Sequence, residues 1–354
     1  MSEGQYLVGV DIGSSAIKLC QLKDVRGKRT LVKFGYQPLP PQTIVDGHVM
    51  NQGVIVEALN KLFADHKVKR RDVALSVSGH SVIIKRITLP MMTAAELAEQ
   101  IGWEAEQQIP FDIKDVQIDY EVLRRRPEQG QMDVLLVAAK KDELADTAQI
   151  AKEAKLRPQV IDVDAFTVQN VFEENYGLPG EGTIALINVG ATLTTINILN
   201  QGVPAFTRDI ANGGNGLTEE IQKQLGISYE DAELYKTGGV GGPEAGSVVP
   251  AEVPRIVRQV VEGLAGEIQR SLDFYLATSG EREIQRIYVT GGSSNLAELG
   301  QAIARRAHAQ VETLDAFKNF AIDPKEVNPD VVRQRAAQAT VALGLALRRD
   351  REKR

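Results

Sequence analysis

The sequence has very little of what marks a secreted, membrane-spanning or disulfide-bonded protein. Its 354 residues include a single cysteine, Cys20, which cannot form an internal disulfide and whose place in an alternating apolar run predicts a small buried side chain. No run approaches the ~20 apolar residues of a membrane span, and the first residues lack the basic and then apolar pattern of a secretory signal. We therefore expect a cytoplasmic protein that reaches a membrane only through partners.

There is also no excess of positive charge or of aromatic side chains. The formal net charge is −6 and aromatic residues make up 5% of the chain, so a broad field that attracts nucleic acid is not expected. The one basic cluster, RRDREKR at residues 348–354, is typical of a solvated tail. The remaining composition, 43% apolar and 25% charged, fits a soluble globular protein. The length predicts two domains, at about 150 residues each.

The sequence contains one short pattern twice. LVGVDIGSSAIKL at 7–19 and IALINVGATLTTINI at 184–198 both run from an apolar segment through a polar residue and a glycine into a second strand-like segment. Asp11 aligns with Asn188 and Gly13 with Gly190, an offset of half the chain. Each copy predicts a β-hairpin with glycine and small residues at its tip. The repeat predicts two related α/β domains, residues 1–165 and 166–354.

The first half continues with a third strand, TLVKFGYQPL, and a helix with one apolar stripe, formed by Ile55, Ala58, Leu59, Leu62 and Phe63. After VALSVSG, the pattern over about 83–160 is β-α-β-β-α-β. This is the order of a split βαβ unit, and it predicts a compact inserted subdomain.

Within this block, Thr93 and Glu96 form a capping box that opens a helix, and Pro110 ends it. The last strand of the block is PQVIDVDAF, which carries Asp162 and Asp164.

The second half has a third strand near VPAFTRDI, a glycine-rich helix entry GGNGLTEEIQKQLG, and a long helix over about 252–279. Residues 213–285 are expected to form its outer subdomain, with TGGVGGPEAGS at 237–247 as a flexible loop. RIYVTGGSSNLAEL at 286–299 predicts a strand, a glycine turn and a helix. ETLDAF and a helix near VVRQRAAQATVALGLAL close the chain.

Glycine and serine at a hairpin tip suit the binding of an anion. Such a turn aims several backbone N–H groups into one concavity, and glycine has no Cβ to block a close approach. Asp11 would hold Mg²⁺ through water, and Lys18 on the returning strand would reach a phosphate oxygen, a contact worth ~1.5–3 kcal/mol. Taken singly, Asp11 fits a turn-stabilising acid better, and VTGGSSN fits an ordinary turn. Three such turns together favour a phosphate-binding cleft between two related domains.

The motifs resemble those of the actin-like ATPase superfamily, which includes actin, the 70 kDa heat-shock chaperones, sugar kinases and FtsA. DIGSSAIKL resembles the first phosphate motif, INVGATLTTINIL the second, and YVTGGSSNL the adenosine motif. Within the superfamily the sequence is most similar to the PilM family of type IV pilus assembly. The supporting stretches are ITLP to IGWEAEQQIPFDIKD, VIDVDAFTVQN, GGNGLTEEI with AELYK, and ATVALGLALR. The resemblance implies an actin-like, ribonuclease-H-like fold with ATP and Mg²⁺ as cofactors.

The resemblance also implies a set of site residues. Those expected to face the phosphates are Gly13, Ser14, Ser15 and Lys18 from the first half, with Asp11 near Mg²⁺, and Asn188, Gly190, Ala191 and Thr192 from the second. Those expected near the ribose and base are Gly214, Glu233, Lys236, Gly291, Gly292 and Ser293.

Two parts of this set have other interpretations. Glu233 and Lys236, three residues apart in AELYK, also fit an ordinary surface pair on a helix. Asp162 and Asp164 lie in what resembles the first connecting motif, where a polar residue positions water, and Asp164 is the candidate catalytic residue. In a strand these two acids would share one face, where they would simply be solvated.

One departure from the pattern concerns hydrolysis. Many relatives have an acid in the second phosphate motif, where this sequence has Asn188. Asparagine can hydrogen-bond a water but adds no negative charge to hold hydrated Mg²⁺. We therefore expect ATP to be bound well and hydrolysed slowly.

The resemblance implies that the partner is the cytoplasmic N-terminal segment of PilN. This segment would bind in a groove between the first subdomain and the inserted one, and the protein would act as a nucleotide-dependent scaffold on the inner face of the inner membrane. Self-association and contacts with other pilus proteins stay open. Two alternatives are an FtsA-like division filament, whose amphipathic membrane helix the closing RRDREKR does not resemble, and a small-molecule kinase of the same superfamily.

Overall fold

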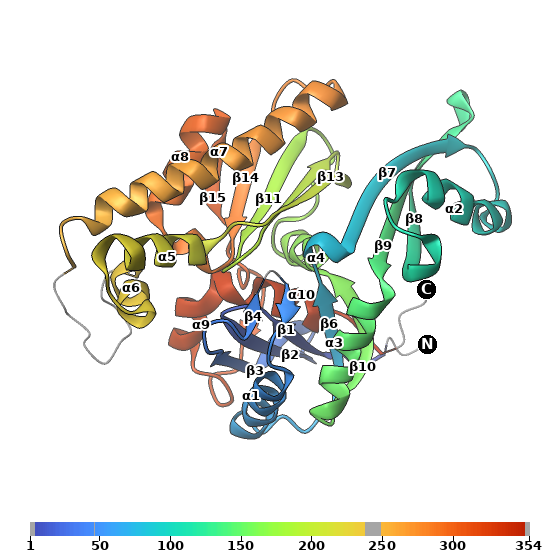
Figure 1. The fold of residues 1–354 in the computed structure, drawn as a ribbon. Helices are drawn as coiled ribbons and strands as arrows, with labels where there is room; N and C mark the ends of the chain where they lie inside the picture. Colours follow the sequence, from blue (N-terminus) through green and yellow to red (C-terminus); the bar gives the residue numbers. More distant parts are fainter. Residues whose placement is uncertain (1–3, 46, 238–248, 351–354) are drawn as a thin grey trace.

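The two predicted hairpins each open a twisted sheet in the computed structural model, which describes residues 4–45, 47–237 and 249–350 (Figure 1). The six-stranded sheet has the order β10-β6-β1-β2-β3-β16 and the five-stranded sheet has the order β13-β12-β11-β14-β15. The strands of the first are β1 (Val8–Ile12), β2 (Ala16–Val25), β3 (Lys28–Pro38), β6 (Asp72–Val77), β10 (Arg157–Val163) and β16 (Ala321–Ile322). Those of the second are β11 (Thr183–Val189), β12 (Thr194–Asn200), β13 (Val203–Ile210), β14 (Arg286–Thr290) and β15 (Gln310–Thr313).

The two sheets share one topology. In each, three antiparallel strands form a meander, and two later strands add in parallel beside the first strand of that meander. The predicted internal duplication therefore extends beyond the hairpins to the order and direction of five strands.

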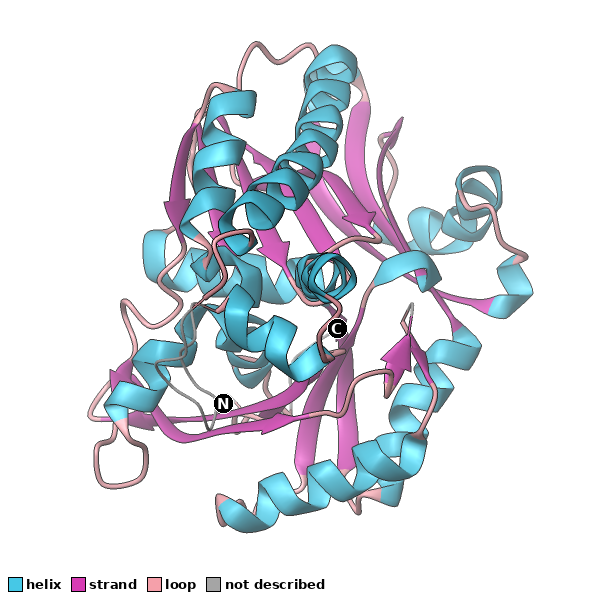
Figure 2. Ribbon diagram, turned by 60° about the vertical axis from the view of Figure 1, so that its left-hand side comes forward, coloured by secondary structure: helices cyan, strands magenta, loops and turns pink. Residues whose placement is uncertain are grey.

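Helices lie between the two sheets and on their outer sides (Figures 1 and 2). They are α1 (Gln52–Asp65), α3 (Lys141–Glu153), α4 (Asp164–Tyr176), α5 (Gly214–Leu225), α6 (Tyr229–Lys236), α7 (Val253–Ser279), α8 (Ala297–Ala307), α9 (Pro329–Arg335) and α10 (Thr340–Ala346). The buried stripe of α1 is the predicted one, and α7 confirms the predicted long helix. No helix in the described ranges is both long and apolar enough to cross a membrane.

The central core joins the two halves through α4 and α10. Buried side chains of both sheets and both helices form one apolar cluster, and α10 packs directly on β1. A Cβ at Gly9 of β1 would overlap the backbone of α10 at Ala342 and Ala346, and a Cβ at Gly344 of α10 would overlap the backbone of Thr167 in α4. Glycine therefore permits a backbone approach that fixes the first hairpin against the helices.

An inserted unit projects beside the two sheets, at the right of Figure 1. It consists of β7 (Val82–Pro90), α2 (Ala94–Gln108), β8 (Val116–Arg126) and β9 (Gln131–Lys140). The strands form an antiparallel sheet in the order β7-β9-β8, and α2 opens with the predicted capping box of Thr93 and Glu96. This unit has its own apolar core, which is distinct from the cores of the two main sheets.

The fourth strand of the predicted split βαβ unit does not join this small sheet. β10 pairs in parallel with β6 of the main sheet, and α3 packs against both strands. The reason is that α3 is the crossover helix between the parallel strands β6 and β10, and the inserted unit interrupts the connection between β6 and α3. Residues near 141–160 thus belong to the main sheet and its cover, not to a subdomain over 83–160.

Two predicted element boundaries were wrong. The strand expected to run through PQVIDVDAF ends at Val163, and Asp164 begins α4, because the apolar residues Ala165, Val168 and Val171 follow a helical spacing into the core. The single helix expected near VVRQRAAQATVALGLAL is α9, a 3₁₀ turn and α10 in succession. The carbonyl of Ala337 in that 3₁₀ turn accepts hydrogen bonds from outside the segment, from the N–H of Gly291 and the hydroxyl of Thr290.

The end of the chain also differs from the expected solvated tail. Arg349 donates a hydrogen bond to the Tyr6 hydroxyl and stacks over its ring, and Arg348 lies 3.4 Å from Asp162. Backbone hydrogen bonds from Leu7 to Arg348 and from Asp350 to Gln5 also hold residues 348–350 against the start of the chain. Residues 351–354, and the predicted loop at 237–247 apart from Thr237, lie outside the described residues. Cys20 is fully buried as predicted, and burial raises the pKa of its thiol.

Candidate functional site

The tips of the two hairpins meet. The hydroxyls of Ser14 and Thr192 lie 2.7 Å apart and share a hydrogen bond. Each tip is closed in the same way: the N–H of Gly13 donates to the carbonyl of Ala16, and the N–H of Gly190 donates to the carbonyl of Leu193. The structure therefore brings the two predicted phosphate loops face to face, with equivalent backbone geometry, from opposite halves of the chain.

Asp11 and Lys18 lie directly opposite each other on the first hairpin. They are cross-strand partners of β1 and β2, and Lys18 Nζ is 3.1 Å from Asp11 Oδ2, with both side chains mostly buried. A Cβ at Gly13 would come within 2.8 Å of the same Nζ. Glycine at this position thus leaves room for the ammonium group beside the tip, and the ion pair holds one cation and one acid at the loop.

The second hairpin tip is fixed by the start of α5. The N–H of Gly214 donates to the carbonyl of Gly190 at 2.9 Å, and the N–H of Asn215 donates to the carbonyl of Ala191 at 2.7 Å. A Cβ at Gly213 would lie 2.7 Å from both carbonyl oxygens. This close contact explains the glycine pair in GGNG and places the predicted residue Gly214 beside the loop.

Glu233 and Lys236 form part of a partly buried network rather than a free surface pair, with Lys236 mostly buried and the Glu233 side chain 41% exposed. Lys236 Nζ is 2.6 Å from Glu233 Oε2 and also donates to the Thr218 hydroxyl and to the Gly214 carbonyl. Thr218 in turn donates to Glu233 at 2.6 Å. The AELYK segment of α6 is thereby anchored to α5 next to the second hairpin.

The third glycine turn joins the same place. Gly291 has φ of +88°, and a Cβ there would overlap the carbonyl of Val189 and lie 2.6 Å from Asn188 Oδ1. The Ser293 hydroxyl donates to the carbonyl of Gly190 at 3.3 Å, while Gly292 lies against Gln338. Gly190 is therefore the point where the second hairpin, α5 and the turn after β14 converge.

Asp164 lies near Asp11 of the first hairpin, whereas Asp162 lies beside the end of the chain. Burial, together with the nearby charge of Asp11, raises the pKa of Asp164 to about 7, although hydrogen bonds from Ser76 and Ser78 favour its ionised form. Asp162 lies beside Arg348 at the end of the chain. The two acids do not share a strand face, because the helix start turns Asp164 away.

Sequence reasoning missed a further acid at this place. Asp209 is the penultimate residue of β13 and contributes to the raised pKa of Asp164, and its own pKa is raised chiefly by burial. Its Oδ2 accepts a hydrogen bond of 2.6 Å from the N–H of Gly79. The available signal was its position, because Asp209 is a charged residue near the end of the strand VPAFTRDI, four residues before Gly213 of the glycine-rich helix entry.

Comparisons with known proteins bear on this site and fold. Residues 9–350 match the family described as type IV pilus assembly protein PilM. The chain belongs to the PilM family. A structure of a PilM-PilN type IV pilus biogenesis complex contains a chain with 26% identity and a TM-score of 0.84, covering 98% of this chain and 99% of that one.

Two more distant structures share the fold of this PilM family member. EutJ from Carboxydothermus hydrogenoformans is 15% identical with a TM-score of 0.59, covering 97% of this chain and 89% of that one. MreB5 of Spiroplasma citri bound to ADP is 12% identical with a TM-score of 0.52, covering 97% and 95%. The predicted family and the predicted actin-like fold are both confirmed.

The raised pKa of Asp164 predicts a pH-dependent stability. The native state holds this proton more tightly than the unfolded chain does, so stability falls as the pH rises from about 4 through 7. Asp164→Asn removes the buried charge, and we expect the variant to be more stable than the wild type by roughly 2–4 kcal/mol at pH 8. The difference should shrink towards zero near pH 4.

The measurement is denaturant unfolding of both proteins at the two pH values, with Asp273→Asn, an exposed acid of α7, as the control. A stability difference of the same size at pH 4 and pH 8 would contradict the assignment.

Proposed function

We propose that the cleft between the two hairpins binds ATP with Mg²⁺, and that the protein acts as a nucleotide-dependent scaffold of type IV pilus assembly that binds the cytoplasmic N-terminal segment of PilN. The observation that carries the proposal is the meeting of two equivalent glycine hairpins at Ser14 and Thr192. It supports a clamp in which each half of the chain contributes one phosphate loop. The MreB5 chain of the same fold is bound to ADP.

The residues present fit such a ligand. Glycines at the three turns let the loops approach one another where a Cβ would overlap a neighbour, so the three turns gather at one place. Lys18 supplies positive charge for a phosphate, and Asp11 would hold Mg²⁺ through water. Gly190, Ala191 and Thr192 would face the phosphates from the other side. Lys236 with Glu233, and the turn of Gly291, Gly292 and Ser293, would border the nucleoside.

The bound nucleotide would supply an anionic chain between the hairpins, and the protein's own groups would determine how fast it is hydrolysed. Asp164, whose pKa lies near 7 in the free protein, is suited to orient or deprotonate a water. Asn188 brings no second charge to the metal side of the cleft. We infer slow hydrolysis, so that the nucleotide serves as a switch. It can shift the equilibrium between two conformations of the protein only by the difference in its affinity for them.

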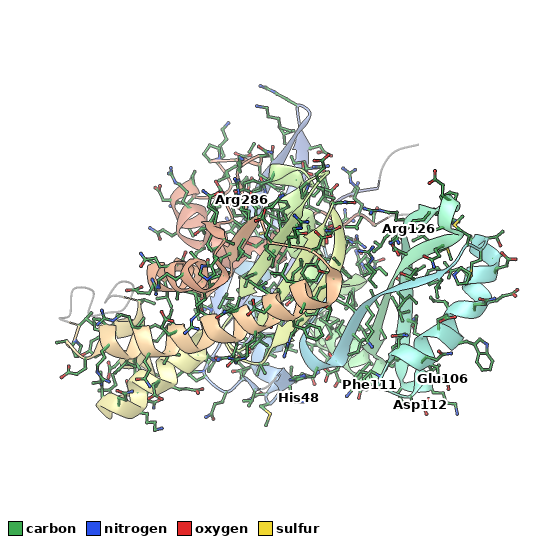
Figure 3. All side chains as sticks on the ribbon, turned by 90° about the horizontal axis from the view of Figure 1, so that it is seen from above. His48, Glu106, Phe111, Asp112, Arg126 and Arg286 are labelled. Atoms are coloured by element: carbon green, nitrogen blue, oxygen red, sulfur yellow. The ribbon has the colours of Figure 1, made fainter. Side chains whose placement is uncertain are left out.

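A groove at the junction of the first domain and the inserted unit is our candidate for the PilN segment. A cavity of about 370 Å³ lies between the segment after α2 and the boundary of β9 with α3, lined by Phe111, Asp112, Lys114, Asp115, Lys140, Lys141 and Asp142. Lys140 lies 4.7 Å from the centre of the Phe111 ring. Figure 3 shows Phe111 and Asp112 near Glu106 of α2, away from Arg126. One aromatic ring among charges of both signs suits an extended peptide with apolar and polar residues.

Titration with MgATP and measurement of phosphate release test the nucleotide part. We expect one ATP per chain and a turnover well below ~1 s⁻¹, the scale at which typical enzyme turnover begins. Asn188→Asp should change turnover or metal dependence more than ATP affinity, because it adds charge on the metal side. Asn60→Asp, at an exposed position of α1, is the control. Absence of ATP binding, or turnover of order 1 s⁻¹ or faster, would refute this part.

Phe111→Ala tests the partner groove. Loss of the ring should weaken binding of a synthetic PilN N-terminal peptide by about tenfold or more, equivalent to ~1.4 kcal/mol, with ATP affinity unchanged. Phe274→Ala removes a ring that is 54% exposed on α7 and should leave both affinities as they are. Isothermal titration measures both ligands. Equal peptide affinity in the Phe111 variant and the wild type would place the segment elsewhere.

A further inference from the structure

Asp209 connects the second domain to the root of the inserted unit. It is the penultimate residue of β13, which is one of the two edge strands of the five-stranded sheet. Its Oδ2 accepts a 2.6 Å hydrogen bond from the N–H of Gly79, which is 130 residues earlier. Gly79 begins the 3₁₀ turn Gly79–Ser81, and this turn leads directly into β7 of the inserted unit. One hydrogen bond thus ties the two parts at the point where the inserted unit leaves the main sheet.

This root is in contact with both sides of the nucleotide cleft. Ser76, the penultimate residue of β6, and Ser78, directly before the turn, both hydrogen-bond Asp164. Gly79 has φ of +80°, and a Cβ there would lie 3.9 Å from Leu193 at the tip of the second hairpin. Gly79 is therefore linked to Asp164 through Ser78 and to the tip of the second hairpin through Leu193. A change in the separation of the two hairpins would act on Gly79 through these contacts.

Beyond this tie, β7 and β13 lie side by side, with a groove between their side chains. The groove has a volume of about 290 Å³, and its walls come from Ile84, Lys85, Arg86 and Leu135 on one side and Pro204, Ala205, Phe206 and Thr207 on the other. The inserted unit therefore touches the second domain in two places, along this groove and at its base. At the base, the hydrogen bond between Asp209 and Gly79 fixes the point where β7 leaves the main sheet.

The carboxylate of Asp209 is poorly satisfied by its surroundings. Among the described residues its Oδ1 is buried without a hydrogen-bond partner. The groups that face it are the Thr195 hydroxyl from β12, the Gly79 N–H and His80 from the turn, and Asp164 from the start of α4. Asp209 is buried, has few donors and lies near the acid Asp164. Charge added beside these two acids will therefore alter the strength of the hydrogen bond between Asp209 and Gly79.

We propose that Asp209 is a latch between the second domain and the inserted unit, which makes partner binding at the Phe111 groove depend on the nucleotide in the cleft. ATP bound between the two hairpins bridges them and keeps the latch closed; without ATP this bridge is lost, the second domain moves away and β7 is released. The inference rests on the proposed function and adds the residue through which its two sites communicate. Asp209 acts as a positioning residue, because it touches Gly79 and not the partner.

The test compares the wild type with Asp209→Ala, Asp209→Asn and the exposed control Asp273→Asn. The affinity of a synthetic PilN N-terminal peptide is measured by titration without nucleotide and with saturating MgATP, after ATP saturation of each protein has been verified. Hydrogen exchange of the segment around Gly79 is followed in the same samples. The ratio of the two peptide affinities measures coupling, which a residue that only stabilises the fold would leave unchanged.

We expect a coupling of about fivefold or more in the wild type, within the usual range for linked sites, and less than about twofold in Asp209→Ala, together with faster exchange at Gly79. Asp209→Asn keeps an acceptor oxygen and should lose less of this coupling. If the alanine variant does not fold, the asparagine variant provides the test. Unchanged coupling in the Asp209 variants at saturating ATP would overturn the latch alone. Failure of the wild type to bind ATP or the peptide would overturn the proposed function and the coupling with it.

Discussion

The contact between the two hairpin tips is the interaction on which the rest of the site depends. Ser14 and Thr192 share a hydrogen bond, and such a bond between neutral groups contributes only ~0.5–1.5 kcal/mol. Its importance lies in position, because each tip is itself fixed by larger structures. The first is held by the packing of β1 on α10 through Gly9, and the second by the backbone bonds between Gly190, Ala191 and the start of α5. A weak bond thus joins two loops that are each held rigidly by their own half of the chain.

The electrostatics of the cleft agree with this arrangement. The positive side chains at the site, Lys18 and Lys236, are each paired with an acid in the free protein. Asp164 and Asp209 both have raised pKa values, mainly because they are buried. The two lysines can bind the phosphates of a ligand, and a metal ion that arrives with the ligand would stabilise the ionised form of the buried acids. The same acids connect the cleft to the root of the inserted unit, so chemistry at the hairpins and the position of β7 are physically linked.

The sequence predicted the elements that repeat and failed where pairing is decided in three dimensions. The hairpins around Gly13 and Gly190, the stripe of α1, the capping box of Thr93 and the length of α7 all come from local pattern. The sheet to which β10 belongs could not be predicted, because periodicity identifies a strand but not its neighbour. The helix start at Asp164 was hidden by the apolar residues that continue the strand pattern. Arg348 and Arg349 look like a solvated tail until their partners Asp162 and Tyr6 are known.

The candidate site was predictable to the same extent. The glycine turns could be identified one by one, and the resemblance to a family indicated that they act together. Asp209 escaped notice because its importance comes from Gly79 and Asp164, which are distant in the chain. The pair of Glu233 and Lys236 could not be separated from an ordinary helix pair until Thr218 and Gly214 were seen beside it.

The central claim is that the two hairpin tips face each other across the phosphate site, and disulfide formation measures this directly. In the double variant Ser14→Cys with Thr192→Cys, sulfur atoms replace two oxygens that lie 2.7 Å apart, within reach of a disulfide, while Cys20 stays buried. The single variants serve as controls. We predict that mild oxidation cross-links the free protein and that saturating MgATP slows the reaction by about tenfold or more. A cross-linking rate that is the same with and without ATP would contradict the account.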